Sequence, residues 1–99
     1  MRPVLPLLAL LAACGAQPSP VMTGAERVEV TRAGRSFVVF HTATRVEVIR
    51  LGYARPGEHR AIRATMVDLI PQTTGCRLVA STLQGDSGEM RGRITCPKS

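Results

Sequence analysis

Cys76-Arg-Leu-Val-Ala-Ser-Thr82 and Glu89-Met-Arg-Gly-Arg-Ile-Thr-Cys96 are two alternating segments near the end of the chain, and their pairing decides the fold. A register that sets Cys76 opposite Cys96 predicts one apolar face, made by the pairs Leu78 with Ile94, Ala80 with Gly92, and Thr82 with Met90. The connection from Leu83 to Gly88 is rich in turn-forming residues. Together these features predict an antiparallel hairpin.

The opposite face of this hairpin is predicted to be solvated, because it pairs Arg77 with Thr95, Val79 with Arg93, and Ser81 with Arg91. A slip of one residue would turn every side chain to the wrong face, so the parity of the register follows from the alternation itself. Arg77, Arg91 and Arg93 therefore form a candidate binding surface on that face.

A helix is predicted over Glu58 to Ile70, just before the hairpin. Its apolar residues fall at the i, i+4, i+7 and i+8 positions that form one face of a helix: Ile62, Met66, Leu69 and Ile70. Glu58 in the first turn favours the positive end of the helix dipole, and Pro71 is expected to stop or kink the helix. Gly75 can adopt the left-handed conformation that closes a helix.

Three strands are predicted before the helix. Residues 27–32 alternate polar and apolar, Ala33-Gly34 supplies a turn, and residues 36–41 hold four successive apolar residues, which suits a strand covered on both sides. Residues 45–51 alternate less clearly, so a short helix stays open as an alternative to a third strand. The sequence thus predicts an α+β fold of order β-β-β-α-β-β, with a mainly antiparallel sheet and one helix packed on one face.

The amino terminus carries a targeting pattern. An apolar run from Val4 to Leu10 follows Arg2 and leads into Leu11-Ala12-Ala13-Cys14, which resembles the lipobox of bacterial lipoprotein signals. The run has about half of the roughly 20 apolar residues that a membrane span requires. A secretory signal peptide without lipidation stays open as an alternative, because Ala12-Ala13 loosely satisfies the cleavage rule for such peptides.

The lipoprotein resemblance implies that residues 1–13 are removed, that the Cys14 thiol receives a diacylglyceryl group and that its new amino group is acylated. It implies a lipid-anchored protein of the bacterial cell envelope. Gly15 follows the cysteine where aspartate would favour the inner membrane in the enterobacterial sorting rule, so the expected location is the outer membrane, facing the periplasm. Residues 14–25 are small, uncharged and rich in proline, which predicts a flexible tether before a single domain over 26–99.

With Cys14 assigned to the lipid, Cys76 and Cys96 are the remaining cysteines of an exported chain, and they are predicted to form a disulfide. A closed loop of about twenty residues would stabilise the fold by roughly 3 kcal/mol. A metal site is the alternative, but His41 and His59 are distant in sequence from the cysteines and from each other, so no metal or other cofactor is expected.

The charge balance is basic, with a formal net charge of +6 for the whole chain and Lys98 as the sole lysine. Arginine pairs with carboxylates and phosphates through two parallel hydrogen bonds, so an anionic envelope polymer or lipid headgroup is a conceivable partner. An ordinary solvated surface explains these charges better, because they alternate along the strands as on a solvated face. The expected compartment disfavours nucleic acid.

Catalytic motifs are weak. Gly85-Asp86-Ser87-Gly88 is similar to the nucleophile surroundings of chymotrypsin-like proteases over four residues, but that family needs two β-barrels, so Asp86 and Ser87 are interpreted as turn residues. Neither histidine is paired in sequence with a nucleophile. The sequence therefore predicts a non-enzymatic accessory or interaction module that docks another envelope protein. The alternatives are a binder of anionic polymer or headgroups and an inhibitor of an envelope-degrading enzyme.

Overall fold

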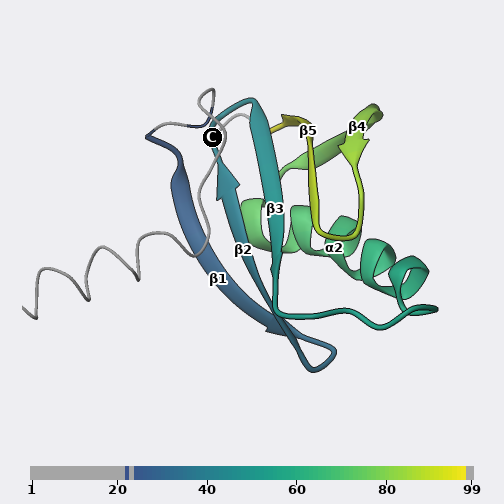
Figure 1. The fold of residues 1–99 in the computed structure, drawn as a ribbon. Helices are drawn as coiled ribbons and strands as arrows, with labels where there is room; N and C mark the ends of the chain where they lie inside the picture. Colours follow the sequence, from purple (N-terminus) through teal and green to yellow (C-terminus); the bar gives the residue numbers. More distant parts are fainter. Residues whose placement is uncertain (1–21, 23, 98–99) are drawn as a thin grey trace, which may run out of the picture.

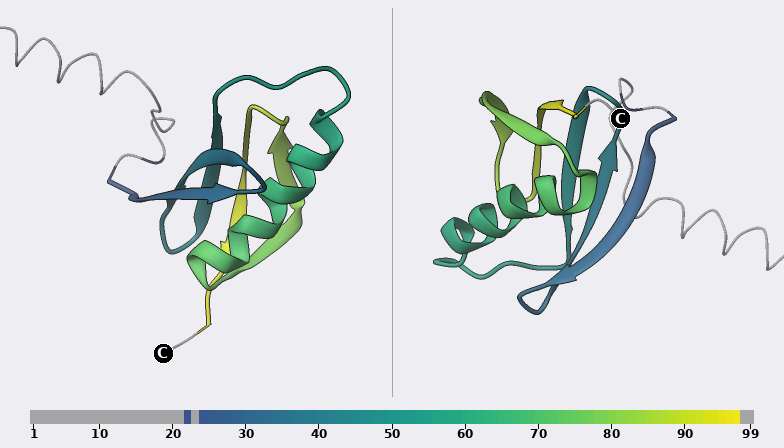
Figure 2. Two further views of the ribbon diagram at one scale, coloured as in Figure 1. Left: turned by 90° about the horizontal axis from the view of Figure 1, so that it is seen from below. Right: turned by 180° about the vertical axis from the view of Figure 1, so that it is seen from behind.

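The computed structural model describes residues 22 and 24–97. Its elements in order are β1 (Glu26–Arg32), β2 (Arg35–His41), β3 (Arg45–Leu51), α2 (His59–Thr74), β4 (Arg77–Gly85) and β5 (Glu89–Thr95). All four strand pairings are antiparallel, in the order β1-β2-β3-β5-β4. The helix crosses one face of this sheet (Figures 1 and 2). The predicted α+β class, element order and antiparallel sheet are confirmed.

The hairpin of β1 and β2 closes through two residues with positive φ, Ala33 at 56° and Gly34 at 75°. Such turns match the right-handed twist of paired strands. The strand that follows is covered on both sides, as predicted. Phe37 and Val39 join the core beneath α2, while Val38 and Phe40 pack with Met22 on the opposite face. Met22 lies within the predicted tether, so this segment contributes a side chain to the fold.

Residues 45–51 form a strand, which excludes the alternative of a short helix. The strand β3 lies between β2 and β5 in the sheet. Val46 and Val48 face the core beneath α2, and the residues that alternate with them face the other side. Placing β3 at the centre brings the first hairpin and the last hairpin into one sheet.

The four predicted contact residues of α2 are all buried and join one core cluster with residues of β2, β3 and β5: Ile62, Met66, Leu69 and Ile70. Of the two effects predicted for Pro71, a stop does not occur, because α2 continues to Thr74. A proline this close to the end removes one amide donor, and the hydroxyls of Thr73 and Thr74 bond to the carbonyls of Leu69 and Ile70.

Hydrogen bonds and an ion pair stabilise the two ends of α2. Gly75 ends the helix with a φ of 72°, and its amide donates to the carbonyl of Pro71 at 2.9 Å. Glu58 precedes the helix instead of lying in its first turn, which corrects the prediction. Its carboxylate accepts from the Arg55 amide at 2.8 Å and pairs with Arg35 at 2.8 Å. These contacts hold the pKa of Glu58 below its usual value.

The register of the final hairpin is confirmed at its first three pairs: Arg77 with Thr95, Leu78 with Ile94, and Val79 with Arg93. Beyond Val79 the predicted pairs are wrong. The ladder resumes with Gln84 opposite Arg91 and Gly85 opposite Met90, so residues 80–83 form a bulge across from Gly92. Ala80 with Gly92, Ser81 with Arg91 and Thr82 with Met90 are therefore not partners.

Two hydrogen bonds of the Thr82 side chain stabilise this bulge. Its hydroxyl accepts from the Arg93 amide at 2.9 Å and donates to the Val79 carbonyl at 2.7 Å, which replaces lost ladder bonds. Gly92 leaves room for the extra residues, because a Cβ there would lie 3.2 Å from Leu78 Cδ1 and 3.3 Å from Thr82 Oγ1. The turn shortens accordingly, and β4 extends to Gly85.

Candidate functional site

The sheet face opposite α2 gathers arginines from three strands. Arg77, Arg91 and Arg93, the predicted binding residues, are all exposed on this face. The structure adds Arg45 of β3, which is the direct cross-strand partner of Arg93. Arg45 was missed because its neighbourhood depends on the pairing of β3 with β5, which local alternation does not contain.

A pocket of about 300 Å³ opens among these arginines. Its lining comes from β3, β4 and β5, together with one residue that precedes β1: Arg45, Val46, Thr82, Gln84, Arg91, Gly92, Arg93 and Met22. Arg77 lies on the same face but outside this lining. The bulge at Gly92 therefore shapes a feature that the predicted regular hairpin would not have had.

The charge of the pocket is only partly compensated. Arg91 donates to Glu89 Oε1 at 2.8 Å and to Gln84 Oε1 at 3.4 Å. Arg45 and Arg93 take part in none of the four ion pairs found within residues 22 and 24–97. Like charges directly opposite each other on a sheet repel. An anion that lies between the two guanidinium groups would therefore lower their electrostatic energy.

Two carboxyl groups adjoin the pocket on the same face. Glu47 of β3 is 4% exposed and is the cross-strand partner of Arg91. Glu89 lies two residues before Arg91 on β5. Burial and the neighbouring Glu47 raise the pKa of Glu89 to about 7, against the opposing effect of Arg91. Sequence reasoning did not identify this carboxyl pair, because its members come from strands far apart in the chain.

A second cluster lies at the turn between β4 and β5. Sequence reasoning found no nucleophile beside either histidine, but the structure places Ser87 Oγ 2.5 Å from His59 Nδ1. Arg50 donates to the Ser87 carbonyl at 2.8 Å. These residues, with Arg63, Asp86 and Gly88, line an open pocket of about 450 Å³.

The hydrogen bonds of this second cluster hold the turn between β4 and β5 in place. The Asp86 carboxylate accepts from the amides of Gly88 at 2.8 Å and Glu89 at 3.3 Å, which lowers its pKa. It is thereby engaged in the turn instead of orienting His59, as the third member of a catalytic triad would. The Arg50 amide also donates to the Gly88 carbonyl at 2.9 Å. The cluster fastens the turn to β3 and to the start of α2.

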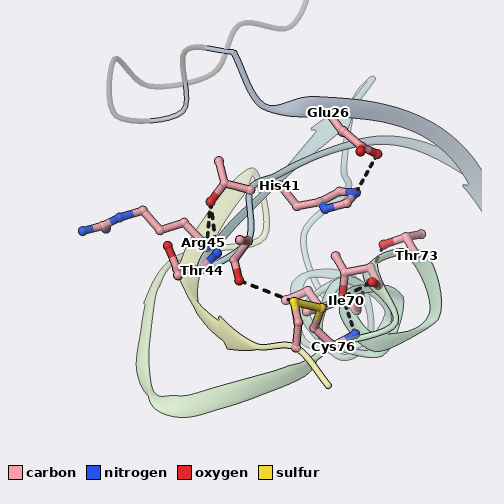
Figure 3. Close-up of a disulfide and its surroundings, with 11 residues drawn as sticks. Glu26, His41, Thr44, Arg45, Ile70, Thr73 and Cys76 are labelled. Carbon is pink, nitrogen blue, oxygen red and sulfur yellow. Dashed lines mark hydrogen bonds and ion pairs between the residues drawn. A yellow bond between two sulfur atoms is a disulfide. The ribbon is translucent and has the colours of Figure 1, made fainter. Parts of the chain in front are cut away.

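The predicted disulfide between Cys76 and Cys96 is present, with a Cα–Cα distance of 4.2 Å. It joins the segment between α2 and β4 to the end of β5. His41 and Glu26 lie beside it, with 3.7 Å between His41 Nε2 and Glu26 Oε1, whereas the Arg45 side chain extends away from it (Figure 3). The disulfide therefore belongs to the end of the sheet and not to the arginine pocket.

Cys14 and the rest of the predicted lipoprotein signal lie outside the described residues. Within the described part of the chain, no group of three or more potential metal ligands comes together. No helix there is long and apolar enough to cross a membrane. Comparison with protein-family models, curated protein sequences and solved structures finds no significant match to this chain.

Proposed function

We propose that this chain is a small lipid-anchored protein of the cell envelope, a non-enzymatic accessory module whose arginine pocket binds an anionic group. One observation carries the proposal: Arg45 and Arg93 face each other directly across β3 and β5, and neither belongs to an ion pair found among the described residues. Two adjacent like charges are unfavourable in the free protein. An anion placed between them converts this repulsion into attraction.

The chemistry of the pocket favours a phosphate or carboxylate group. Guanidinium groups bind both through parallel charge-assisted hydrogen bonds, which are about twice as strong as neutral ones. A volume of about 300 Å³ is at the lower limit of ligand pockets, so the pocket fits one acidic group and part of its carrier. The hydroxyl of Thr82 and the amide of Gln84 add neutral polar groups to the same lining.

The position of the pocket suits a ligand at a membrane surface. Met22 lines the pocket and lies eight residues after Cys14. An extended chain of that length spans at most about 28 Å. If Cys14 carries the lipid, the pocket stays within this distance of the bilayer, where lipid phosphates and acidic envelope polymers are both available.

Docking of another envelope protein is the second candidate. Tyr53, in the connection between β3 and α2, is 83% exposed and is the one exposed large hydrophobic side chain among the described residues. Tyrosine is enriched among the residues that dominate protein interfaces. This contact would depend less on salt than arginine binding does, so the ionic-strength dependence of binding separates the two functions.

The double variant Arg45→Gln, Arg93→Gln is expected to lose at least about tenfold in affinity for anionic vesicles or an acidic polysaccharide, because charge-assisted hydrogen bonds are lost without a change in fold. Surface plasmon resonance with phosphatidylglycerol vesicles, acidic polysaccharide and inorganic phosphate separates the possible sources of the anion. Arg55→Gln with Arg60→Gln is the matched control, because it removes the same two positive charges outside the pocket. Equal losses in both variants would show nonspecific attraction instead of a site.

Cys14→Ser is expected to release the protein from the membrane, because stable membrane binding of the module requires its acyl chains. Fractionation of cells and intact-mass analysis of membrane-extracted protein measure this, with lipid mass expected on a terminus that begins at Cys14. The matched control, Cys76→Ser with Cys96→Ser, should stay in the membrane fraction. A Cys14→Ser protein that also stays there would place the anchor elsewhere.

A further inference from the structure

We propose that the carboxyl pair of Glu47 and Glu89 holds a proton that controls the arginine pocket, so that anions bind tightly when the proton is present and more weakly when it leaves. This inference rests on the proposed function and adds its regulation. The pair of Glu47 and Glu89 adjoins the pocket on the same face of the sheet but does not line it.

The same arginine adjoins both residues of the pair. Glu47 is the direct cross-strand partner of Arg91, and Arg91 Nη1 lies 2.8 Å from Glu89 Oε1. Glu47 is 4% exposed, so its carboxyl group is largely removed from water. Arg91 also lines the pocket. The charge of the pair therefore acts on the pocket through a side chain that both features have in common.

The second oxygen of Glu89 indicates where the proton resides. Glu89 Oε2 is buried and has no hydrogen-bond partner within the described residues. A buried acceptor without a donor is costly, and so are two adjacent carboxylates that are both ionised. A single proton between Glu47 and Glu89 supplies the missing donor and removes the repulsion. In agreement, burial and Glu47 raise the pKa of Glu89 to about 7.

The groups that face Glu89 are few. On β3 they are Ile49, its cross-strand partner, and Glu47, which lies diagonally across. On β5 it contacts Arg91, and β4 contributes Gln84, which bonds to the same arginine. The helix α2 lies on the other face of the sheet. In the turn before β5, the Asp86 carboxylate accepts from the Glu89 amide at 3.3 Å. Burial and Glu47 raise the pKa of Glu89, and Arg91 lowers it.

The consequence is a pH-dependent affinity. Below pH about 7 the pair carries one negative charge, which Arg91 compensates. Above it the pair carries two, and the added charge lowers the potential at the pocket. A unit charge within several ångströms of a surface site changes its affinity several-fold. Anion binding should therefore weaken as pH rises through this value.

Dextran sulfate is the probe, because its sulfate groups keep their charge across the range. Affinity is measured by fluorescence anisotropy from about pH 5.5 to about pH 8.5 at constant ionic strength. The wild-type protein should lose affinity several-fold over this range. Glu89→Gln should bind equally well throughout, close to the low-pH affinity of the wild type, and Glu47→Gln should behave similarly.

Two control variants test whether other titratable groups cause the pH dependence of binding. Glu29→Gln takes away an exposed carboxylate of β1 and should keep the full pH dependence. His41→Gln with His59→Gln removes both histidines, which lie outside the pocket, and should keep the full pH dependence as well. If the histidine variant binds independently of pH, or if Glu89→Gln keeps the wild-type profile, the carboxyl pair is not the control.

Failure of the inference and failure of the proposed function are distinguishable. Binding of dextran sulfate by the wild type with the same affinity at every pH overturns the inference alone. Absence of binding of dextran sulfate at every pH, together with absence of binding of phosphatidylglycerol vesicles, acidic polysaccharide and inorganic phosphate, overturns the proposed function and the inference with it. The melting temperature is an independent readout: the raised pKa of Glu89 means that the folded state binds the proton more tightly, so stability should fall between pH about 5 and about 7.5 in the wild type but less in Glu89→Gln.

Discussion

Replacement of Met66 by aspartate is expected to unfold the domain. Met66 is 0% exposed and lies in the face of α2 that packs against the sheet, in one cluster with Phe37 and Val48. A carboxylate in that position is buried without a partner, which costs several kcal/mol. Small domains have a total stability of about 5–15 kcal/mol, with the smallest near the lower limit. The variant should show no cooperative thermal transition by circular dichroism.

Met66→Leu is the matched control, because it conserves volume and polarity and should cost less than about 1.5 kcal/mol. The pair of variants separates the charge from the mere loss of the methionine. A Met66→Asp protein with a cooperative transition near that of the wild type would show that this face of α2 does not pack against the sheet.

Removal of the disulfide is the second large effect. The bond between Cys76 and Cys96 closes a loop with a sequence separation of 20, which includes both strands of the final hairpin. In the chain-entropy model its loss costs about 3 kcal/mol. For a domain of this size that corresponds to a fall in melting temperature of roughly 15 °C. Differential scanning calorimetry of Cys76→Ala with Cys96→Ala measures it.

Reduction of the wild-type protein should give the same shift, and the reductant should not affect the double variant. Anion binding below the lowered melting temperature should persist, because neither cysteine lines the arginine pocket. An unchanged melting temperature, or free thiols in peptide mapping of protein isolated from cells, would contradict the role of this bond in holding the final hairpin together.

The architecture could be predicted from the sequence because its signals are local. The spacing of Ile62, Met66, Leu69 and Ile70 identifies the face of α2. The alternation in 27–32 and the apolar run in 36–41 identify two strands. The irregular half of the final hairpin could not be predicted in this way. It depends on the hydroxyl of Thr82 and on the space at Gly92, and alternation contains information about neither.

The candidate site was only half predictable for a related reason. Arg91 and Arg93 follow from the alternation of one strand, but Arg45 joins them only because β3 pairs with β5 across the intervening helix. The carboxyl pair of Glu47 and Glu89 depends on the same pairing. Contact between such distant segments is set by the topology of the whole sheet, for which a single sequence holds no periodic signal.

Binding of an anionic group between Arg45 and Arg93 is the central claim, and the arginine side-chain NMR signals report on it directly. The Nε–Hε resonances are followed during a titration with inorganic phosphate and with the acidic polysaccharide. Saturable shifts of Arg45 and Arg93, with Arg60 and Arg63 of α2 unmoved, are the predicted result. Shifts that spread equally over all arginines, or that leave Arg45 and Arg93 unchanged, would contradict a binding site at this pocket.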